Sequence, residues 1–504
     1  MKNIYFLLLL FVLSPAFAQK KKIKAPVASD TLQQLDVFVN KMLGEWSVPG
    51  AALCIVKDGK LLYAKGYGVK DVKTQAPVTA QTLFGIASCS KSFTAACLAI
   101  LADEGKLDWN KPIKEYMPDF QLSDEHATRT ITARDLVSHR SGLPRHDYVW
   151  VSAQLNRKEM FDRLKYLPLN KPIYAQYQYN NLMYMAAGML IERLSGKTWE
   201  TFMQEKILDP IGMKTTVLTY PEMLKSTDYA LSYSDEKNPA KEAGFDSNVD
   251  GIGPAGAVKA NVTEISNWLM LQLNKGKVGT QVIVSEKNLN ENHTPLAVVQ
   301  PAEAKYPELG FGTYGMGWNI NTYRGHLRRQ HGGSIEGYRS LMSVFPNDNM
   351  AVFITTNTGA VGYNFVNTIT NYIVDTYLEK NVIDWNSRLR KDFTDAKEKS
   401  AKAKVDNETQ RQKDTKPTHI LGSYAGTYEH PAYGTLTLSI DGEALKADFH
   451  TEKIALRHYH YDIFEALGDW EGIKFKFLMN AKGDIDRVSL EMPAAAMDIE
   501  LMKK

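Results

Sequence analysis

Ser88 and Lys91 stand three residues apart in segment 84–101, at the start of a run with helical spacing. Residues at this spacing are neighbours on a helix, so their side chains can meet. A serine hydroxyl is a poor nucleophile until a nearby base removes its proton. A lysine can be that base only if burial or another cation lowers its pKa well below about 10.4. The pair therefore indicates a serine nucleophile activated by lysine, beside helix N-terminal N–H groups that can stabilise an oxyanion.

A second Ser-x-x-Lys sequence begins at Ser234 and lacks the surroundings that this chemistry needs. Behind Ser88, apolar residues recur at helical spacing from 93 to 101, and Gly105 marks the end of the helix. Ser234 is followed instead by acidic residues and Pro239, which is typical of a surface loop. Ser88 is therefore the predicted nucleophile.

Two more short sequences supply polar side chains that such a site can use. Tyr-x-Asn occurs once, at Tyr179 and Asn181, directly before an apolar segment of helical spacing at 182–194. A phenol near a lysine can share its proton transfers, although Tyr179 could also be a core aromatic and Asn181 a helix N-cap. His-x-Gly occurs once, at His331 and Gly333. Such a donor with glycines at a strand edge can bind substrate, although His331 could also be a structural histidine.

The elements that must position these residues are a sheet and its helices. Segments 51–56 and 61–64 flank Asp58-Gly59, a strong hairpin signal, and strand-like runs return at 338–345 and 351–356. Strands at both ends of a region, with helices between them, predict one sheet closed by its terminal segments. We expect the fold class α/β (α+β), with an antiparallel sheet flanked by helices and a helical subdomain.

The remainder of the chain changes character twice. Segment 391–416 is rich in Lys, Glu, Asp, Gln and Ala, which predicts a solvated helix or a flexible linker with few contacts across it. From 420 onward short runs alternate between apolar and polar residues, which indicates a small antiparallel β module, a C-terminal β-barrel. His458 and His460 alternate on one of its strands, which could support chelation, but core packing with a polar rim is the simpler interpretation.

The order Ser-x-x-Lys, Tyr-x-Asn, His-x-Gly resembles the serine β-lactamase and penicillin-binding-protein superfamily. The His form is similar to its class C β-lactamase-related branch, which includes D-aminopeptidases, esterases and D-Ala-D-Ala carboxypeptidases. The resemblance extends to Glu104–Leu107, Asp135–Pro144, Tyr314–Trp318 and Thr355–Asn357. The C-terminal module resembles the lipocalin-like domain often found behind this hydrolase domain.

The resemblance implies a role for each matching residue. Ser88 would be the acylated nucleophile, with Lys91 and Tyr179 as the general base and acid pair. Asn181 would hold the substrate amide, and His331 would contact the polar end of the substrate or tune Tyr179. The backbone N–H groups of Ser88 and Ser334 would form the oxyanion hole, with Gly333 beside them on the strand. No cofactor is implied.

The predicted organisation is a signal peptide at 1–18, an N-terminal tail at 19–30, a serine hydrolase domain at 31–383, a charged linker at 384–417 and a lipocalin-like β domain at 418–504. Lys2, a short apolar run and Ala16-Phe17-Ala18 are typical of a cleaved leader, so we expect a periplasmic or secreted protein. No later segment is long enough for a stable membrane span. The three cysteines form no obvious disulfide framework, and no familiar metal-binding spacing occurs.

The net charge of +3 over 504 residues gives no reason to expect a nucleic-acid partner. The predicted partner is a small-molecule or peptide substrate, and the C-terminal domain is a candidate surface for oligomer formation. The predicted function is hydrolysis of amide or ester bonds through an acyl-enzyme. The alternatives are a β-lactamase of modest activity and a penicillin-binding sensor that acylates without efficient turnover.

Overall fold

The computed structural model describes residues 28–234, 241–244, 248–299, 304–379, 381–492 and 497–504. The predicted signal segment and its cleavage site near Ala18 lie outside these ranges, as does most of the second Ser-x-x-Lys sequence, from Asp235 to Lys237.

A nine-stranded antiparallel sheet forms the centre of the larger part of the molecule, in the order β10-β11-β12-β13-β14-β15-β1-β2-β3. Strand β1 (Gly50–Lys57) from the N-terminal side pairs with β15 (Met350–Thr356), so the two ends of the region close one sheet, as predicted. The hairpin from β1 to β2 (Lys60–Asp71) turns at Asp58 and Gly59, which both have positive φ, as this turn type requires.

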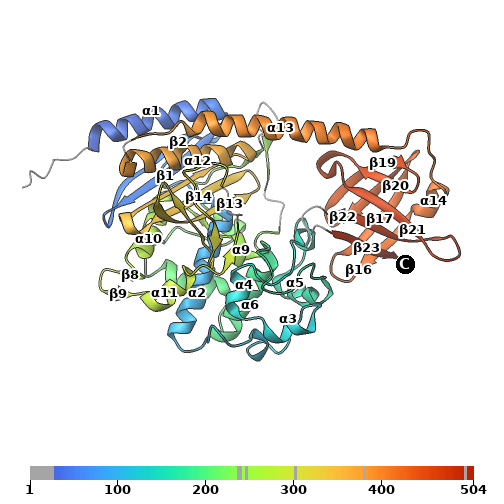
Figure 1. Ribbon diagram of the computed structural model, residues 1–504, viewed down its shortest axis with the longest axis horizontal. Coiled ribbons are helices and arrows are strands. Elements are labelled where there is room, and N and C mark those ends of the chain that lie inside the picture. Colours follow the sequence, from blue (N-terminus) through green and yellow to red (C-terminus); the bar gives the residue numbers. More distant parts are fainter. Residues whose placement is uncertain (1–27, 235–240, 245–247, 300–303, 380, 493–496) are drawn as a thin grey trace, which may run out of the picture.

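Helices cover both faces of this sheet (Figure 1). Helices α1 (Ala28–Trp46) and α12 (Ala360–Val374) lie on one face, and α10 (Val262–Leu273) lies on the other. Strand β1 contributes to two apolar cores, one on each face of the sheet. Leu53 and Ile55 belong to the core beneath α1 and α12, and Ala52 and Cys54 belong to the core on the α10 side. Because both faces are covered, the strand is apolar throughout rather than alternating.

Helix α2 (Ser90–Asp103) carries the predicted Ser88–Lys91 pair at its N-terminal end. The spacing of its apolar residues predicted one buried face, but every residue from Ser90 to Leu101 is buried. Helices α6 (Asn181–Ser195), α9 (Gly253–Gly256) and α11 (Glu286–Asn292) pack around α2, so it has no solvent face from Ser90 to Leu101. Gly105, at φ +68°, follows its end as predicted.

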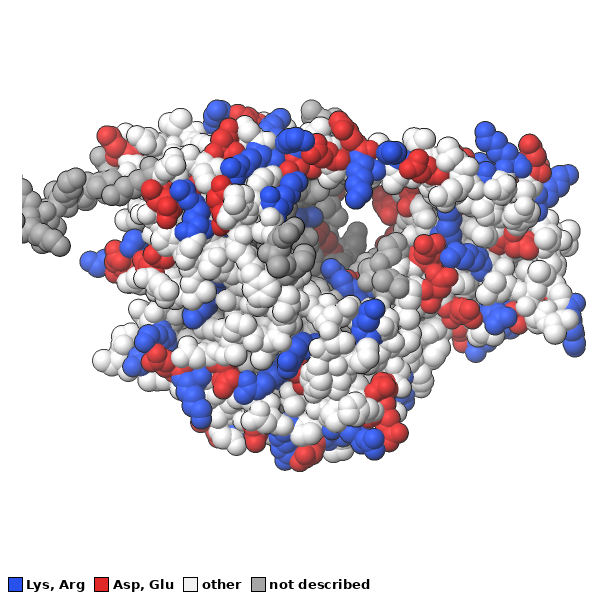
Figure 2. Space-filling view, viewed as in Figure 1, with Lys and Arg blue, Asp and Glu red and all other residues white. Residues whose placement is uncertain are grey.

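The charged segment forms a single 26-residue helix, α13 (Trp385–Gln410), which is the first of the two predicted alternatives. Its first turns pack on the large domain: Trp385 is buried, and Asn386 accepts a hydrogen bond from the Trp46 indole at 2.8 Å. Lysine, arginine, aspartate and glutamate mingle along its exposed side (Figure 2). Many oppositely charged neighbours keep such a helix soluble without a large apolar face.

The C-terminal module is a closed antiparallel barrel of eight strands, as predicted. The strands are β16 (Gly426–His430), β17 (Gly434–Asp441), β18 (Ala444–Phe449), β19 (Glu452–His460), β20 (Ile463–Ala466), β21 (Lys474–Met479), β22 (Ile485–Met492) and β23 (Met497–Lys503). The two histidines on β19 bind separate groups: His458 Nε2 contacts the Tyr461 carbonyl, and His460 Nδ1 accepts from the Gln412 amide.

The prediction of few contacts across the linker is wrong, because the barrel packs directly on segment 145–152 of the large domain. The Tyr433 hydroxyl lies 2.8 Å from His146 Nδ1, and His450 Nε2 lies 3.0 Å from the Tyr148 carbonyl. The rings of Tyr148 and Trp470 lie 4.7 Å apart. Linker composition could not reveal this interface, because its contacts come from short loops and turns of the two domains rather than from the linker.

Two further features concern the whole chain. Cys54, Cys89 and Cys97 are buried and unpaired in the structure. Within the described ranges, no helix has the length and apolar character needed to cross a bilayer.

Candidate active site

Ser88 lies in a single 3₁₀ turn, Ala87–Cys89, which leads into α2. Ala87 adopts φ +48°, a conformation that costs free energy for any residue with a Cβ. This bend carries Ser88 to the rim of a pocket of about 480 Å³, which is lined by Ser88, Arg145, Trp150, Tyr179, Asn181, Asn319, His331, Gly332, Ser334, Ile335 and Glu336. Ser88, the predicted nucleophile, and most of the other predicted site residues therefore share one cavity.

Lys91 is completely buried and makes three hydrogen bonds through its Nζ atom. These reach Ser88 Oγ at 3.1 Å, Asn181 Oδ1 at 2.9 Å and the Ala255 carbonyl at 2.7 Å. Among the described residues, no carboxylate contacts the Lys91 amine directly. Burial, and then the positive charge of Arg145, hold the Lys91 pKa well below its ordinary value, while Asp147 acts in the opposite direction. A lysine in this setting can lose its proton and serve as a base.

Tyr179 donates a hydrogen bond from its hydroxyl to Ser88 Oγ at 2.7 Å. Burial raises the Tyr179 pKa above that of an ordinary phenol, so its hydroxyl keeps its proton and can donate it. The His139 ring packs 4.4 Å away, and His139 Nδ1 accepts from the Asn180 amide at 3.1 Å. His139 thus fixes the turn that presents Tyr179.

The helix N-cap of α6 is Asn180, whose side chain accepts from the Met183 amide, and not Asn181. The Asn181 side chain is therefore available to the site: its oxygen bonds Lys91, and its nitrogen donates to Asp147 Oδ1 at 3.3 Å. The capping alternative considered for Asn181 belongs to its neighbour.

His331 lies on β13 (His326–Ile335) and already uses both ring nitrogens. Nδ1 donates to the Gly332 carbonyl at 2.8 Å, which leaves Nε2 to accept from the Tyr314 hydroxyl at 2.9 Å. Burial lowers its pKa to about 3, so the ring is neutral. Its centroid lies 6.4 Å from that of Tyr179. His331 also lines the pocket that contains Ser88, so both of its predicted roles, contact with the polar end of the substrate and tuning of Tyr179, stay predictions.

Gly333 and Ser334 follow on the same strand. A Cβ on Gly333 would lie 2.2 Å from the Ile86 carbonyl oxygen, so only glycine lets β13 approach the turn that carries Ser88. This close approach brings Ser334 to the same pocket as Ser88, where the resemblance placed the two oxyanion N–H groups.

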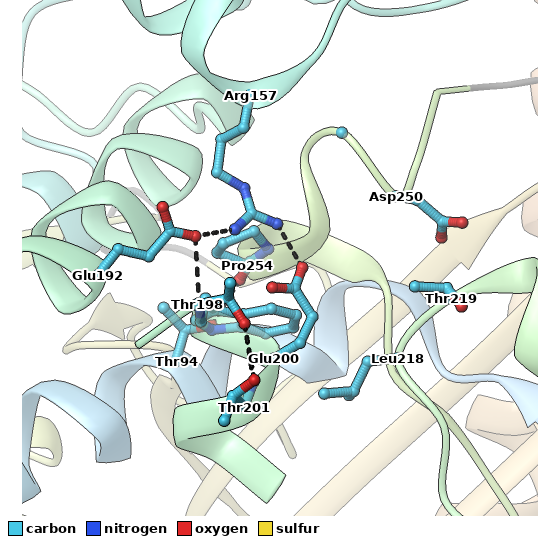
Figure 3. Close-up of polar contacts among 12 residues, drawn as sticks. Thr94, Arg157, Glu192, Thr198, Glu200, Thr201, Leu218, Thr219, Asp250 and Pro254 are labelled. Carbon is cyan, nitrogen blue, oxygen red and sulfur yellow. Dashed lines mark hydrogen bonds and ion pairs between the residues drawn. The ribbon is translucent and has the colours of Figure 1, made fainter. Parts of the chain in front are cut away.

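The Ala255 carbonyl that accepts from Lys91 belongs to the short helix α9 (Gly253–Gly256). Side chains around the neighbouring residue Pro254 fix the position of this helix (Figure 3). Thr94 Oγ1 donates to the Pro254 carbonyl at 2.7 Å and accepts from the Trp199 indole at 3.1 Å. Arg157 packs over the Trp199 ring and forms ion pairs with Glu192 and Glu200, the latter at 2.6 Å. This network gives Lys91 a fixed acceptor.

Several residues that shape the site had no role in the sequence-based prediction: His139, Arg145, Asp147, Tyr314 and Ala255. His139 and Tyr314 lie within segments that carried the family resemblance, so that signal was present without an assigned role. Arg145 packs 5.1 Å over the Tyr179 ring and pairs with Asp147 at 2.6 Å. Nothing in their spacing connects residue 145 to residues 91 and 179, since the fold alone brings them together.

No group of three or more His, Cys, Asp or Glu side chains suited to a metal ion occurs in the described ranges.

Comparison with known proteins identifies the families that the two domains match. Residues 35–368 match the beta-lactamase family model, and residues 410–503 match a domain of unknown function, DUF3471. An unguisins hydrolase, ungD′, of Aspergillus campestris is 30% identical over 437 residues, covering 82% of this chain and 78% of that protein. Protein flp of Staphylococcus aureus is 25% identical over 66% of this chain and 64% of its own length.

Solved structures share the fold. The octameric penicillin-binding protein homologue from Pyrococcus abyssi superposes with a TM-score of 0.60 at 21% identity, over 94% of this chain and all of that one. The D-amino acid amidase from Ochrobactrum anthropi gives 0.55 at 23% identity, over 67% of this chain and 95% of its own.

The fold and the match over residues 35–368 define a hydrolase-type protein of the serine β-lactamase and penicillin-binding-protein superfamily. The chain belongs to the beta-lactamase family, and its C-terminal barrel is compatible with a lipocalin-like domain.

Proposed function

We propose that this chain is an exported serine hydrolase that forms an acyl-enzyme at Ser88 and hydrolyses amide or ester bonds. The observation that carries the proposal is the position of Ser88 Oγ, 3.1 Å from a buried lysine amine and 2.7 Å from a protonated phenol. A nucleophile in contact with both a base and an acid is the minimum requirement for acyl transfer.

The proposed reaction has two steps, acylation of Ser88 and hydrolysis of the acyl-enzyme by water. Neutral Lys91 takes the Ser88 proton as Oγ bonds to the substrate carbonyl carbon, and the carbonyl electrons move to the oxygen. The backbone N–H groups of Ser88 and Ser334 stabilise this oxyanion. When the intermediate collapses, the Tyr179 hydroxyl gives its proton to the leaving amine or alcohol, and the Lys91 ammonium restores it. Water then attacks the acyl group by the same steps in reverse and releases a carboxylic acid.

Amide and ester substrates are preferred over β-lactams because the third motif contributes a neutral His331 rather than a lysine. A neutral ring cannot supply positive charge for a substrate carboxylate. The family relatives include an unguisins hydrolase, and structural relatives include a D-amino acid amidase and EstCE1, a hydrolase with promiscuous acyltransferase activity. These names support acyl hydrolysis as the class of reaction without fixing one substrate.

Steady-state assays with a nitrophenyl ester, D- and L-aminoacyl amides and a chromogenic β-lactam test the proposal, together with mass spectrometry of trapped protein. We expect turnover of an ester or amide and a transient adduct on the peptide containing Ser88. Turnover restricted to the β-lactam would favour a β-lactamase. A stoichiometric adduct without turnover would favour a penicillin-binding sensor.

Ser88→Ala should abolish both turnover and labelling by a fluorophosphonate, because loss of the nucleophile costs about 10⁶-fold. Ser234→Ala is the matched control from the other Ser-x-x-Lys sequence and should retain both. Full labelling of the Ser88→Ala protein would refute the assignment of the nucleophile.

Export rests on the leader-like segment alone. Expression of the full chain in a Gram-negative host should yield a periplasmic protein whose first residue is Gln19. An intact N-terminus in the cytoplasmic fraction would count against it.

A further inference from the structure

Arg328 is a buried cation that has no carboxylate partner among the described residues and packs over the Tyr323 ring, with its Cζ 5.4 Å from the ring centroid. Its side chain is only 4% exposed, and its one hydrogen bond among the described residues runs from Nε to Asn321 Oδ1 at 3.0 Å. Arg157 provides the contrast, since two glutamates flank it (Figure 3). Lys259, equally buried, pairs with Asp250 at 2.8 Å. Buried arginines are almost always paired because an uncompensated charge is expensive to desolvate.

The Arg328 guanidinium lines a pocket of about 380 Å³ between the sheet and helices α12 and α13. Asn364 and Asn371 of α12 line the same pocket and are buried to at least nine-tenths, and their side chains make no hydrogen bond to any described residue. Gln330 of β13 also lines it, and its side-chain oxygen is buried without a partner in the described ranges. The pocket therefore gathers one unpaired cation and three amides that can turn N–H groups inward.

The one acidic lining residue, Asp392, is already engaged. Its carboxylate accepts from Lys305 at 2.7 Å and from the Tyr306 hydroxyl at 2.8 Å. The electrostatic influences on Arg328 come from tyrosines, and burial lowers its pKa to about 10. Arginine remains charged at that value, so the positive charge persists at neutral pH.

This pocket is separate from the catalytic one. Arg328 and His331 are three positions apart on β13, so their side chains point to opposite faces of the sheet. The catalytic pocket and this pocket share no lining residue.

We propose that the pocket formed by Arg328, Asn364 and Asn371 binds an organic monocarboxylate. A planar guanidinium matches a carboxylate through two parallel hydrogen bonds, and neutral amides add donors without further charge. One cation balances one negative charge, whereas phosphate would bring more than the site neutralises. Trp385, Leu389 and Phe393 provide apolar walls for the body of the ligand. This proposal does not depend on the proposed function.

Thermal unfolding of the full chain with phenylacetate tests the proposal, with phenylacetamide as the uncharged probe of the same shape. Inorganic phosphate and matched sodium chloride serve as further controls. We expect 10 mM phenylacetate to raise Tm by about 2 °C and the amide, phosphate and chloride to leave it unchanged.

Arg328→Gln should remove the phenylacetate shift and weaken binding measured by calorimetry at least about tenfold, with ester turnover retained. Asn364→Asp should place a carboxylate inside the pocket, raise Tm without ligand at pH 7 and also abolish the shift. Asn290→Asp is the control: Asn290 is an exposed residue of helix α11 (Glu286–Asn292) that lines neither pocket, so this change should not raise Tm without ligand.

The Asn364→Asp variant keeps the proposal testable if Arg328→Gln fails to fold. An unchanged shift in either pocket variant would overturn the proposal, as would no shift in the wild-type protein. Equal stabilisation by phenylacetamide, or stabilisation by phosphate alone, would also overturn it.

Discussion

At the scale of single residues, burial disfavours the charged forms of both Lys91 and Tyr179. Within the part of the chain that the structure describes, Lys91 has three hydrogen-bond acceptors and no direct carboxylate partner that would stabilise its ammonium form. Tyr179 is subject to the same burial, which raises its pKa and keeps it protonated. The shared environment therefore moves a base and an acid toward the forms that acyl transfer requires.

Lys91→Arg should lower kcat/KM about 10²–10⁴-fold, nearly as much as Lys91→Ala. Arginine retains the positive charge but cannot release its proton near neutral pH. Ester hydrolysis measured on folded variants checks this. An arginine variant that keeps more than about a tenth of the wild-type rate would show that Lys91 only positions Ser88.

The pH profile should respond in opposite directions to the two charges beside Lys91. The neutral amine is the active form, so the rate falls at acidic pH as Lys91 gains its proton. Arg145→Gln removes a charge that lowers the Lys91 pKa, so the acidic limb should move to higher pH. Asp147→Asn should move it to lower pH. Shifts of the same sign in both variants would contradict the assignment of this limb to Lys91.

At the scale of elements, the site depends on how closely strand β13 approaches the turn before α2. The motifs on three separate segments were predictable because each has a local signature: a helical run, an N-cap region, a strand edge. Their mutual distances were not, because they depend on strand register and on a positive φ at Ala87 that alanine rarely adopts. The burial of α2 on all sides was missed for the same reason, since periodicity reports one face and not what covers the other.

Two neighbouring glycines make this dependence measurable. Gly333→Ala would put a Cβ 2.2 Å from the Ile86 carbonyl, whereas the nearest atom to a Cβ on Gly332 is 3.8 Å away. Gly333→Ala should therefore push β13 from the turn and reduce kcat/KM about 10²-fold, with Gly332→Ala within about threefold of wild type. Similar losses in both variants would mean that strand flexibility, and not close approach, is what the glycines provide.

At the scale of the whole molecule, the barrel is part of the support for the active-site region. His146 Nε2 donates to the Pro168 carbonyl at 3.1 Å, so Nδ1 of the neutral ring accepts from Tyr433 of the barrel. Arg145 and Asp147, which adjust the Lys91 pKa, are the residues on either side of His146. Architecture and domain types were predictable from the sequence, but this interface was not, because it joins short loops without distinctive composition.

Tyr433→Phe should lower the free energy of unfolding by about 1–2 kcal/mol, because His146 Nδ1 is then buried without a donor. In a chain of this size the corresponding fall in Tm is about 2 °C, measurable by calorimetry. Tyr461→Phe, an exposed tyrosine of the same barrel, should leave Tm unchanged. Equal effects from the two substitutions would argue against support through His146.

The number of residues in helix α13 sets both the distance and the rotation between its contacts with the large domain and its contacts with the barrel. Its first turns bind the large domain through Trp385 and Asn386, and its last turns bind the barrel, where Glu408 pairs with Arg457 at 2.7 Å and Arg411 donates to the Tyr459 carbonyl. Because the span is continuous helix, one inserted residue would rotate everything beyond it by about 100° and advance it by about 1.5 Å. A loop of equal composition would absorb such a change. In this helix, both anchors can bind only if the rotation between them is preserved, which fixes the number of residues between them. This highly polar segment therefore tolerates insertions and deletions poorly.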